Sequence, residues 1–235
     1  MRINKYLATC ELGSRRKVEE FVKLGLIKIN GSVVTDLSYD VSEKDRVEYK
    51  GKLVKLQTNK VYYMLNKPKC YITSLKDEKD RKVVTQLLKG VKEKVFPVGR
   101  LDYNTEGLLL LTNDGDWSNN ITHPSKNISK TYEVKLKKPL TSKQAMQIHN
   151  GIVIDGKKTL PAKIVMHNVD GEYYIYHMTI YEGRNREIRK IFEAIGLKIY
   201  NLKRLSIGLL GLGNLKEGKF RKLTRDEINL VFMGE

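Results

Sequence analysis

The sequence predicts an α+β fold in two parts, a small unit over residues 1–58 and a larger one over residues 59–235. Residues 1–58 show a helix pattern followed by short strand patterns, and a polar stretch ending at Lys60 follows as a linker. The larger part contains segments in which apolar and polar residues alternate, as in strands that bury one face. Strand and helix patterns do not alternate regularly, so a parallel sheet with crossover helices is not expected.

In the small unit, a helix is expected to begin after Ser14 and to end at Gly25, because the apolar residues between them share one face. The segment IKINGSVV that follows predicts two strands joined by an Asn-Gly turn. The segment RVEYKGK predicts one further strand, which closes the unit near Lys52.

The larger unit is expected to contain several strands. VYYMLNKP reads as a strand that Pro68 ends. Residues 108–111 form a continuous apolar run between a glycine and an Asn-Asp-Gly turn, which predicts a strand buried on both faces. TYEVKLKK and EYYIYHMTIYEG alternate apolar and polar residues, which predicts strands with one buried face.

Helices are expected at three places in the same unit. Thr141 with Gln144, and Thr224 with Glu227, have the spacing of capping boxes and predict where two helices begin. The second of these helices is expected to contain Ile228, Val231 and Phe232. Between the two helices, apolar residues at positions i, i+3, i+4 and i+7 predict an amphipathic helix over residues 185–195.

The charge balance indicates the kind of partner. There are 44 Lys and Arg residues against 27 Asp and Glu, a formal net charge of +17. A surplus of this size favours a polyanion, nucleic acid first and an anionic membrane second. No apolar run approaches the roughly 18–20 residues that span a bilayer, and the N-terminal segment lacks the apolar stretch of a secretory signal. We therefore expect no membrane partner and a cytoplasmic location.

Cysteine and histidine usage agrees with this expectation. Cys10 and Cys70 are isolated in the sequence, which suits a reducing compartment without disulfides. The four histidines show no metal-ligand spacing, and no CxxC motif is present. The sequence therefore predicts no metal site and disfavours a metal-dependent nuclease.

The N-terminal segment carries basic residues at the start of its expected helix, where the helix dipole disfavours them. They can be an ordinary solvated face, or they can bind phosphate through side chains and free backbone N–H groups. The segment MRINKYLATCELGSRRKVEEFVKLGLIKING resembles the RNA-binding module named after ribosomal protein S4. The resemblance implies docking on structured RNA through phosphates and shape. The RNA-binding residues expected here are Arg2, Lys5, Ser14, Arg15 and Arg16.

Four fragments of the larger unit are informative together: GRLDYNTEG before the buried strand, LNKP, KTY and EGRNREIRKIF. In this order they resemble the ribosomal RNA pseudouridine synthases of the RsuA/RluB type. The resemblance covers the chain from about Val61 onwards. It implies the pseudouridine synthase fold, a mainly antiparallel mixed β-sheet flanked by helices, preceded by the S4-like module.

The resemblance also implies roles for individual residues. Asp102 corresponds to the catalytic carboxylate, Tyr132 to a tyrosine that packs against the target base, and Arg189 to an arginine that pairs with the aspartate. From spacing alone, the same residues read as a turn residue, a core residue and a surface residue. Arg100 corresponds to the basic residue that fills the space left by the extracted base. Arg184 and Arg186 are expected to bind flanking RNA.

The sequence departs from the family at Cys70, where many relatives have glycine. A positive φ at this position would make cysteine costly.

The chemistry agrees with what the sequence lacks. Isomerisation of uridine changes no oxidation state and imports no group, so no cofactor is expected, and no nucleotide-binding motif is present. A carboxylate can attack the sugar, add to the base or remove a proton from the sugar, and an arginine partner keeps it ionised. The base must first be flipped out of the RNA.

We expect an enzyme that acts as a monomer during ribosome biogenesis, on 23S ribosomal RNA or a precursor subunit. The alternatives are a 16S rRNA pseudouridine synthase, a non-catalytic RNA-binding ribosome assembly factor, and a DNA-binding regulator that uses the basic N-terminal helices.

Overall fold

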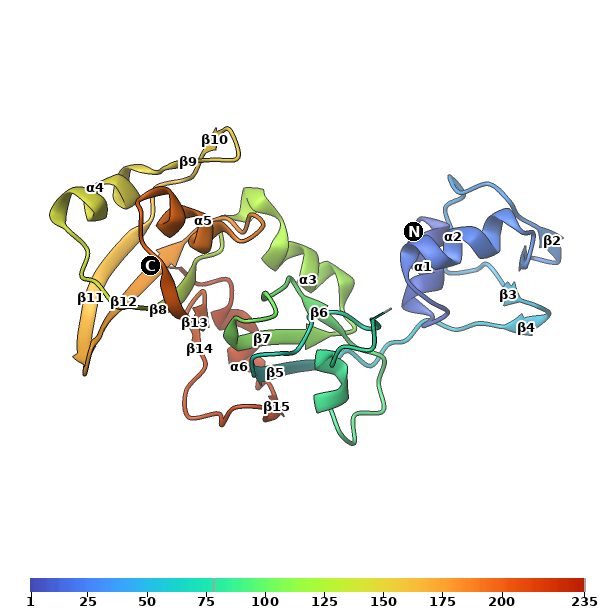
Figure 1. Ribbon diagram of the computed structural model, residues 1–235. Helices are drawn as coiled ribbons and strands as arrows, with labels where there is room; N and C mark the ends of the chain where they lie inside the picture. Colours follow the sequence, from blue (N-terminus) through green and yellow to red (C-terminus); the bar gives the residue numbers. More distant parts are fainter. Residues whose placement is uncertain (78, 235) are drawn as a thin grey trace. The chain divides into compact units, whose positions relative to one another are not determined.

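The computed structural model describes residues 1–77 and 79–234. The chain divides into two compact units, Met1–Lys60 and Val61–Glu235 (Figure 1). The boundary predicted from the sequence, after residue 58, falls two residues earlier. No described helix has the length and apolar character needed to cross a bilayer.

The first unit packs two helices on a four-stranded antiparallel sheet with the order β2-β1-β3-β4. Its core is formed by apolar side chains of both helices and of β1 and β3. Its elements are α1 (Ile3–Thr9), α2 (Arg15–Lys23), β1 (Ile27–Ile29), β2 (Ser32–Val33), β3 (Val47–Tyr49) and β4 (Lys52–Leu53).

Local sequence signals explain most of this unit. The Ser14 side chain accepts a hydrogen bond from the backbone N–H of Lys17 and caps α2, as predicted. Asn30 and Gly31 both have positive φ and form the tight turn between β1 and β2. The single strand predicted for RVEYKGK is wrong, because Lys50 and Gly51 also have positive φ (47° and 75°) and turn the chain into the hairpin β3–β4.

The second unit is built on a nine-stranded mixed sheet. Seven strands follow the order β11-β12-β8-β13-β7-β5-β15, with β14 paired to β13 and β6 paired to β7. Only the β13–β7 pairing is parallel among the described strands. The predicted mainly antiparallel mixed sheet is confirmed. The strands are β5 (Tyr62–Lys67), β6 (Phe96–Val98), β7 (Glu106–Thr112), β8 (Lys130–Leu136), β11 (Lys163–Asp170), β12 (Tyr173–Ile180), β13 (Ile199–Ile207), β14 (Leu210–Gly211) and β15 (Phe220–Lys222).

Helices cover the sheet on both faces. On one face, side chains of α4 (Ser142–Asn150) and α5 (Glu187–Ala194) pack against the alternating buried residues of β8 and β12. On the other face, α3 (Gly115–Thr122) and the segment that ends α6 (Arg225–Leu230) pack against β7 and β14. The four leucines of β7 are fully buried and alternate between these two cores, which confirms the predicted strand with two buried faces. Each such burial contributes roughly 1.5–3 kcal/mol.

Two helix ends differ from the prediction. Arg186 has φ 53°, in the left-handed region, so α5 begins at Glu187 and not at residue 185. The last helix ends at Leu230, and Phe232 beyond it is 41% exposed. Helix α3 was not predicted: the Asn-Asp-Gly segment read as a turn. Asp114 there caps a helix, since its carboxylate accepts from two backbone N–H groups of the first turn.

Candidate active site

One cavity of about 410 Å³ brings together all the site residues predicted for the second unit. It lies between the loop before β7, the start of β8, the segment that leads into α5, and β13. The predicted residues on its wall are Arg100, Asp102, Tyr132, Arg184, Arg186 and Arg189.

A buried lysine holds the loop that carries Asp102. Lys67, at the end of β5, is fully buried, and its Nζ donates to the carbonyl oxygens of Pro68, Asp102 and Thr105 at 3.1, 3.1 and 2.9 Å. Burial lowers the pKa of Lys67 to about 8, and Asp102 partly opposes that shift. These bonds fix the backbone of the loop, while the side chain of Asp102 lies on the cavity wall.

A glycine allows the strand after this loop to approach its neighbour. Gly107 has φ 102° and pairs with Arg204 of β13 in the parallel register. A Cβ atom on Gly107 would lie 2.2 Å from the carbonyl oxygen of Arg204, so any other residue would force the strands apart. This explains the glycine that ends GRLDYNTEG.

Asp102 and Arg189 meet in the cavity. Nε of Arg189 lies 3.7 Å from Oδ2 of Asp102, an ion pair longer than a hydrogen bond. Nη2 of Arg189 donates to the carbonyl oxygen of Asn104 at 3.1 Å and to Oγ1 of Thr105 at 3.3 Å. Burial lowers the pKa of Arg189 and Asp102 raises it, but a guanidinium stays charged in either case. Arg189 therefore supplies positive charge beside the carboxylate and ties α5 to its loop.

Tyr132 both packs in the core and lines the cavity. It stands opposite Arg204 on the neighbouring strand. Nε of Arg204 donates to the carbonyl oxygen of Leu108 at 2.7 Å, and Nη1 reaches the hydroxyl of Tyr132 at 3.5 Å. Arg204 is only 4% exposed, and its Nη2 has no hydrogen-bond partner within the described part of the chain. This guanidinium therefore contacts the tyrosine and places a buried cation in the cavity wall.

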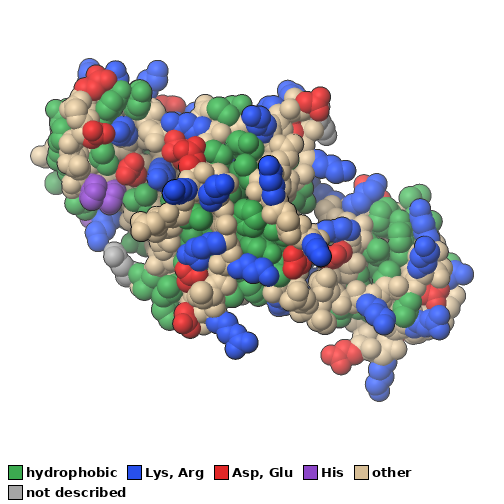
Figure 2. All heavy atoms as spheres, turned by 90° about the horizontal axis from the view of Figure 1, so that it is seen from below, with side chains coloured by type: hydrophobic (Ala, Val, Ile, Leu, Met, Phe, Trp, Pro, Cys, Tyr) green, Lys and Arg blue, Asp and Glu red, His purple; other side chains and the backbone are tan. Residues whose placement is uncertain are grey.

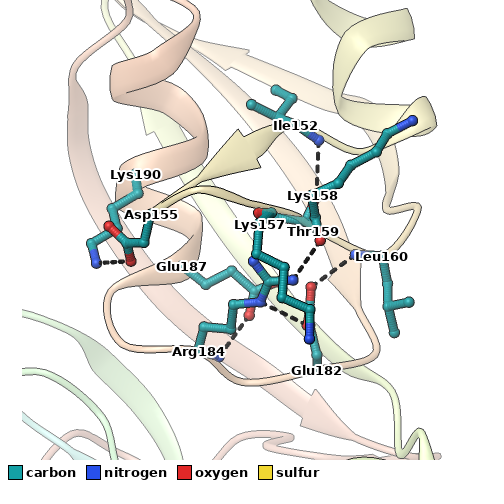
Figure 3. A network of polar contacts seen from close by, with 10 residues as sticks. All are labelled: Ile152, Asp155, Lys157, Lys158, Thr159, Leu160, Glu182, Arg184, Glu187 and Lys190. Carbon is teal, nitrogen blue, oxygen red and sulfur yellow. Dashed lines mark hydrogen bonds and ion pairs between the residues drawn. The ribbon is translucent and has the colours of Figure 1, made fainter.

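Arg184 lies on the cavity wall, but its guanidinium is engaged inside the protein (Figure 3). Nε is paired with Glu182 at 2.9 Å, and Nη1 and Nη2 donate to the carbonyl oxygens of Lys157 and Lys158. The backbone N–H of Arg184 donates to the carboxylate of Glu187 at 2.8 Å. Burial is the main cause that raises the pKa of Glu187 to about 7, and Glu182 adds to it.

Four residues have structural roles that were not assigned from the sequence: Lys130, Glu187 and Arg204 line the cavity, and Lys67 lies beneath the loop that carries Asp102. Lys67 could have been recognised as a lysine at the end of a mostly apolar strand, directly before a proline. In the sequence, Arg204 and Lys130 are two of 44 basic residues, and no local pattern marks either as buried. Arg204 is buried instead, and burial lowers the pKa of Lys130 to about 8. No local sequence pattern indicates that Glu187 is buried, because its burial depends on the packing of the loop before α5.

The charge of the wall is positive. Seven Lys and Arg side chains line the cavity against three carboxylates, those of Asp102, Glu182 and Glu187. The face of the molecule seen in Figure 2 likewise carries more Lys and Arg than Asp and Glu side chains. Within residues 1–77 and 79–234, no group of three or more His, Cys, Asp or Glu is placed to hold a metal ion.

The remaining predicted residues lie in the first unit. Arg15 and Arg16 are exposed in the first turn of α2, where no acidic residue is present. The side chain of Ser14 caps this helix, and a guanidinium N–H of Arg2 donates to the carbonyl oxygen of Ser38. Lys5 lies in α1. Their contact with RNA stays a prediction.

Comparisons with known proteins cover both units. A family model described as RNA pseudouridylate synthase matches residues 61–194, and an S4 domain model matches residues 1–47. "Ribosomal large subunit pseudouridine synthase B" of Bacillus subtilis (strain 168) is 42% identical to the chain, over 97% of this chain and 93% of that protein. "Ribosomal small subunit pseudouridine synthase A" of Haemophilus influenzae is 34% identical, over 97% of this chain and 98% of that protein. A solved structure described as "Crystal structure of pseudouridylate synthase" matches with a TM-score of 0.71 and 33% identity, and covers 98% of this chain and 99% of its own.

Proposed function

Since this chain belongs to the RNA pseudouridylate synthase family and begins with an S4 domain, we propose that it converts a specific uridine of 23S ribosomal RNA into pseudouridine. The two resemblances noted in the sequence, and the pseudouridine synthase activity inferred from them, are confirmed by the family matches. We also propose roles for individual residues of the cavity and a cellular setting for the reaction.

The ion pair between Asp102 and Arg189 in the cavity carries the proposal. The reaction breaks the bond between N1 of uracil and C1′ of ribose and forms a bond from C5 to C1′. A proton leaves C5 and N1 gains one, so atoms and charge balance. Asp102 is the group that reacts with the sugar or the base, and the Arg189 guanidinium favours the ionised form of this carboxylate.

Space and stacking support a flipped nucleotide as the occupant of the cavity. A volume of about 410 Å³ falls within the roughly 300–1,000 Å³ typical of small-ligand sites. The ring of Tyr132 lies on its wall, where stacking on a displaced base contributes roughly 1–3 kcal/mol. Arg100 lies on the same wall and is the candidate to occupy the gap left in the RNA.

The positive charge supports a polyanionic substrate. A net charge of +17 favours binding to phosphates, and the cavity wall itself is rich in arginine. In the S4 domain, Arg15 and Arg16 stand at the N-terminus of α2 beside free backbone N–H groups, an arrangement that suits a phosphate. We propose that the protein acts as a monomer in the cytoplasm, on free rRNA or on a precursor subunit.

Incubation of the purified protein with unmodified 23S and 16S transcripts, followed by carbodiimide mapping and primer extension, tests the substrate. A new stop in the 23S transcript alone is the expected result. A stop in the 16S transcript alone would overturn the choice of 23S rRNA and would agree with the small-subunit relative. If neither transcript is converted, precursor 50S and 30S particles are tested in the same way, and conversion of neither would overturn the proposal.

A further inference from the structure

A short hairpin stands beside the cavity. Strands β9 (Val153–Ile154) and β10 (Lys157–Lys158) are antiparallel and are joined by Asp155 and Gly156. Both turn residues have positive φ, 51° and 74°, which fits the tight two-residue turn that Asp-Gly sequences favour. An isolated hairpin of this length would not be stable in water, so it depends on its anchors.

The hairpin is anchored at its tip and at its base (Figure 3). At the tip, Nζ of Lys190 on α5 is paired with the carboxylate of Asp155. At the base, Glu182 accepts a hydrogen bond from the backbone N–H of Leu160 at 2.8 Å. The hydroxyl of Thr159 accepts one from the backbone N–H of Ile152 at 3.0 Å, which closes the base.

Arg184 is the central anchor. Its two terminal nitrogens donate to the carbonyl oxygens of Lys157 and Lys158, and its Nε is paired with Glu182. The planar guanidinium thus binds two successive carbonyl oxygens at once, which a lysine ammonium cannot do in the same geometry. Because these three nitrogens are directed at the protein, Arg184 is better placed to position the hairpin than to contact RNA itself.

The hairpin presents two lysines in different directions. Lys157 and Lys158 are both exposed, and neither has an ion-pair partner within residues 1–77 and 79–234. Lys157 lies on the cavity wall and Lys158 does not. Figure 3 shows the two side chains leaving β10 on different sides, as successive residues of a strand do.

We propose that Lys157 binds a backbone phosphate next to the flipped nucleotide, and that Arg184 is the positioning residue that holds Lys157 there. This inference rests on the proposed function, because it places an RNA strand at the mouth of the cavity. A flipped nucleotide leaves its two flanking phosphates at that mouth, and a lysine on the wall is a suitable cation for one of them.

The experiment compares four variants with the wild-type protein on one 23S transcript: Lys157→Gln, Lys158→Gln, Arg184→Lys, and the double variant with Lys157→Gln and Arg184→Lys. The RNA concentration that gives half the maximal single-turnover rate is measured at several salt concentrations. Equilibrium binding of the same transcript is measured in parallel. Lys158→Gln is the matched control, because it removes the same charge from the same hairpin.

Lys157→Gln is expected to raise the half-saturating RNA concentration about three- to tenfold, more than it lowers the saturated rate, and to reduce the salt slope by about 1. Lys158→Gln should change the half-saturating RNA concentration and the saturated rate by less than twofold. Arg184→Lys keeps the charge but loses the fork, so it should resemble Lys157→Gln. The double variant should be no worse than either single one, since both changes remove the same contact.

Equal effects of Lys157→Gln and Lys158→Gln, or no effect of either, would overturn the phosphate contact. Wild-type behaviour of Arg184→Lys, or effects that add in the double variant, would overturn the positioning role. Should Arg184→Lys fail to fold, judged by its thermal unfolding, the comparison of the two lysines still decides the contact. Absence of conversion by the wild-type protein would instead count against the proposed function, and the binding measurements would still test Lys157.

Discussion

Arg189 and Asp102 approach each other from different parts of the fold: Nε of the arginine, on α5, lies 3.7 Å from Oδ2 of the aspartate in the loop before β7. The aspartate side chain is 33% exposed and the arginine 16%. The carboxylate is thus open to a ligand on one side and faces a half-buried cation on the other. The same arginine donates hydrogen bonds to Asn104 and Thr105 of the loop. One side chain therefore supplies the positive charge beside Asp102 and holds the loop that carries it.

Replacing Arg189 by lysine keeps the charge but loses the hydrogen bonds from Nη2. We expect the single-turnover rate to fall about 10- to 100-fold, because one ammonium cannot both face the carboxylate and hold the loop. Arg225→Lys, at an exposed position in α6, is the matched control and should keep the wild-type rate. An unchanged rate for Arg189→Lys would show that the charge alone suffices.

Lys67 offers a test of how the catalytic loop is held. Lys67→Met keeps an unbranched side chain but leaves the carbonyl oxygens of Asp102 and of the buried Thr105 without this donor. An unsatisfied buried acceptor costs about 1–3 kcal/mol, so the midpoint of thermal unfolding should fall by several degrees. The exposed Lys89→Met is the control. If the two variants unfold at the same temperature, the loop does not depend on Lys67.

The raised pKa of Glu187 predicts that the stability of the folded protein depends on pH. Its pKa in the folded protein is raised to about 7, from 4.5. A carboxyl group of this kind contributes stability that is fully present below pH 4.5 and is lost as the pH rises through 7, because the folded protein holds the proton more tightly. Glu187→Gln mimics the protonated form. Its unfolding temperature relative to wild type should therefore rise between pH 5 and pH 8, and parallel pH profiles for the two proteins would contradict the prediction.

Cys70 provides a prediction on stability. Its φ is 62°, so the positive φ considered from the sequence is present, and the exposed cysteine sits where a glycine would be unstrained. Cys70→Gly should raise the free energy of unfolding by about 0.5–1 kcal/mol, the left-handed strain of about 1–2 kcal/mol less the entropy that glycine loses on folding. Cys70→Ser tests the thiol alone and should be neutral. A loss of stability in the glycine variant would show that the cysteine side chain contributes more than the strain costs.

Local patterns predicted the elements well where one interaction decides them. Thr141 and Gln144 form the expected capping box at the start of α4. The turn predicted around Asp114 was wrong, because the sequence Asn-Asp-Gly suits a turn and the start of a helix equally. Long-range pairing was beyond local patterns: Arg204 is buried only because β13 pairs with β7 and β8. The family resemblance named the residues Asp102, Tyr132 and Arg189, but their common cavity depends on segments far apart in the sequence.

The most direct test of the central claim compares the wild-type protein with Asp102→Asn on the transcript or precursor particle that the wild-type protein converts. The variant keeps the size of the side chain and removes its charge. We predict loss of detectable pseudouridine in the mapped position, with RNA binding within about threefold of wild type, because phosphate contacts supply most of the affinity. Conversion by the variant at a rate near that of the wild-type protein would show that Asp102 is not the catalytic carboxylate.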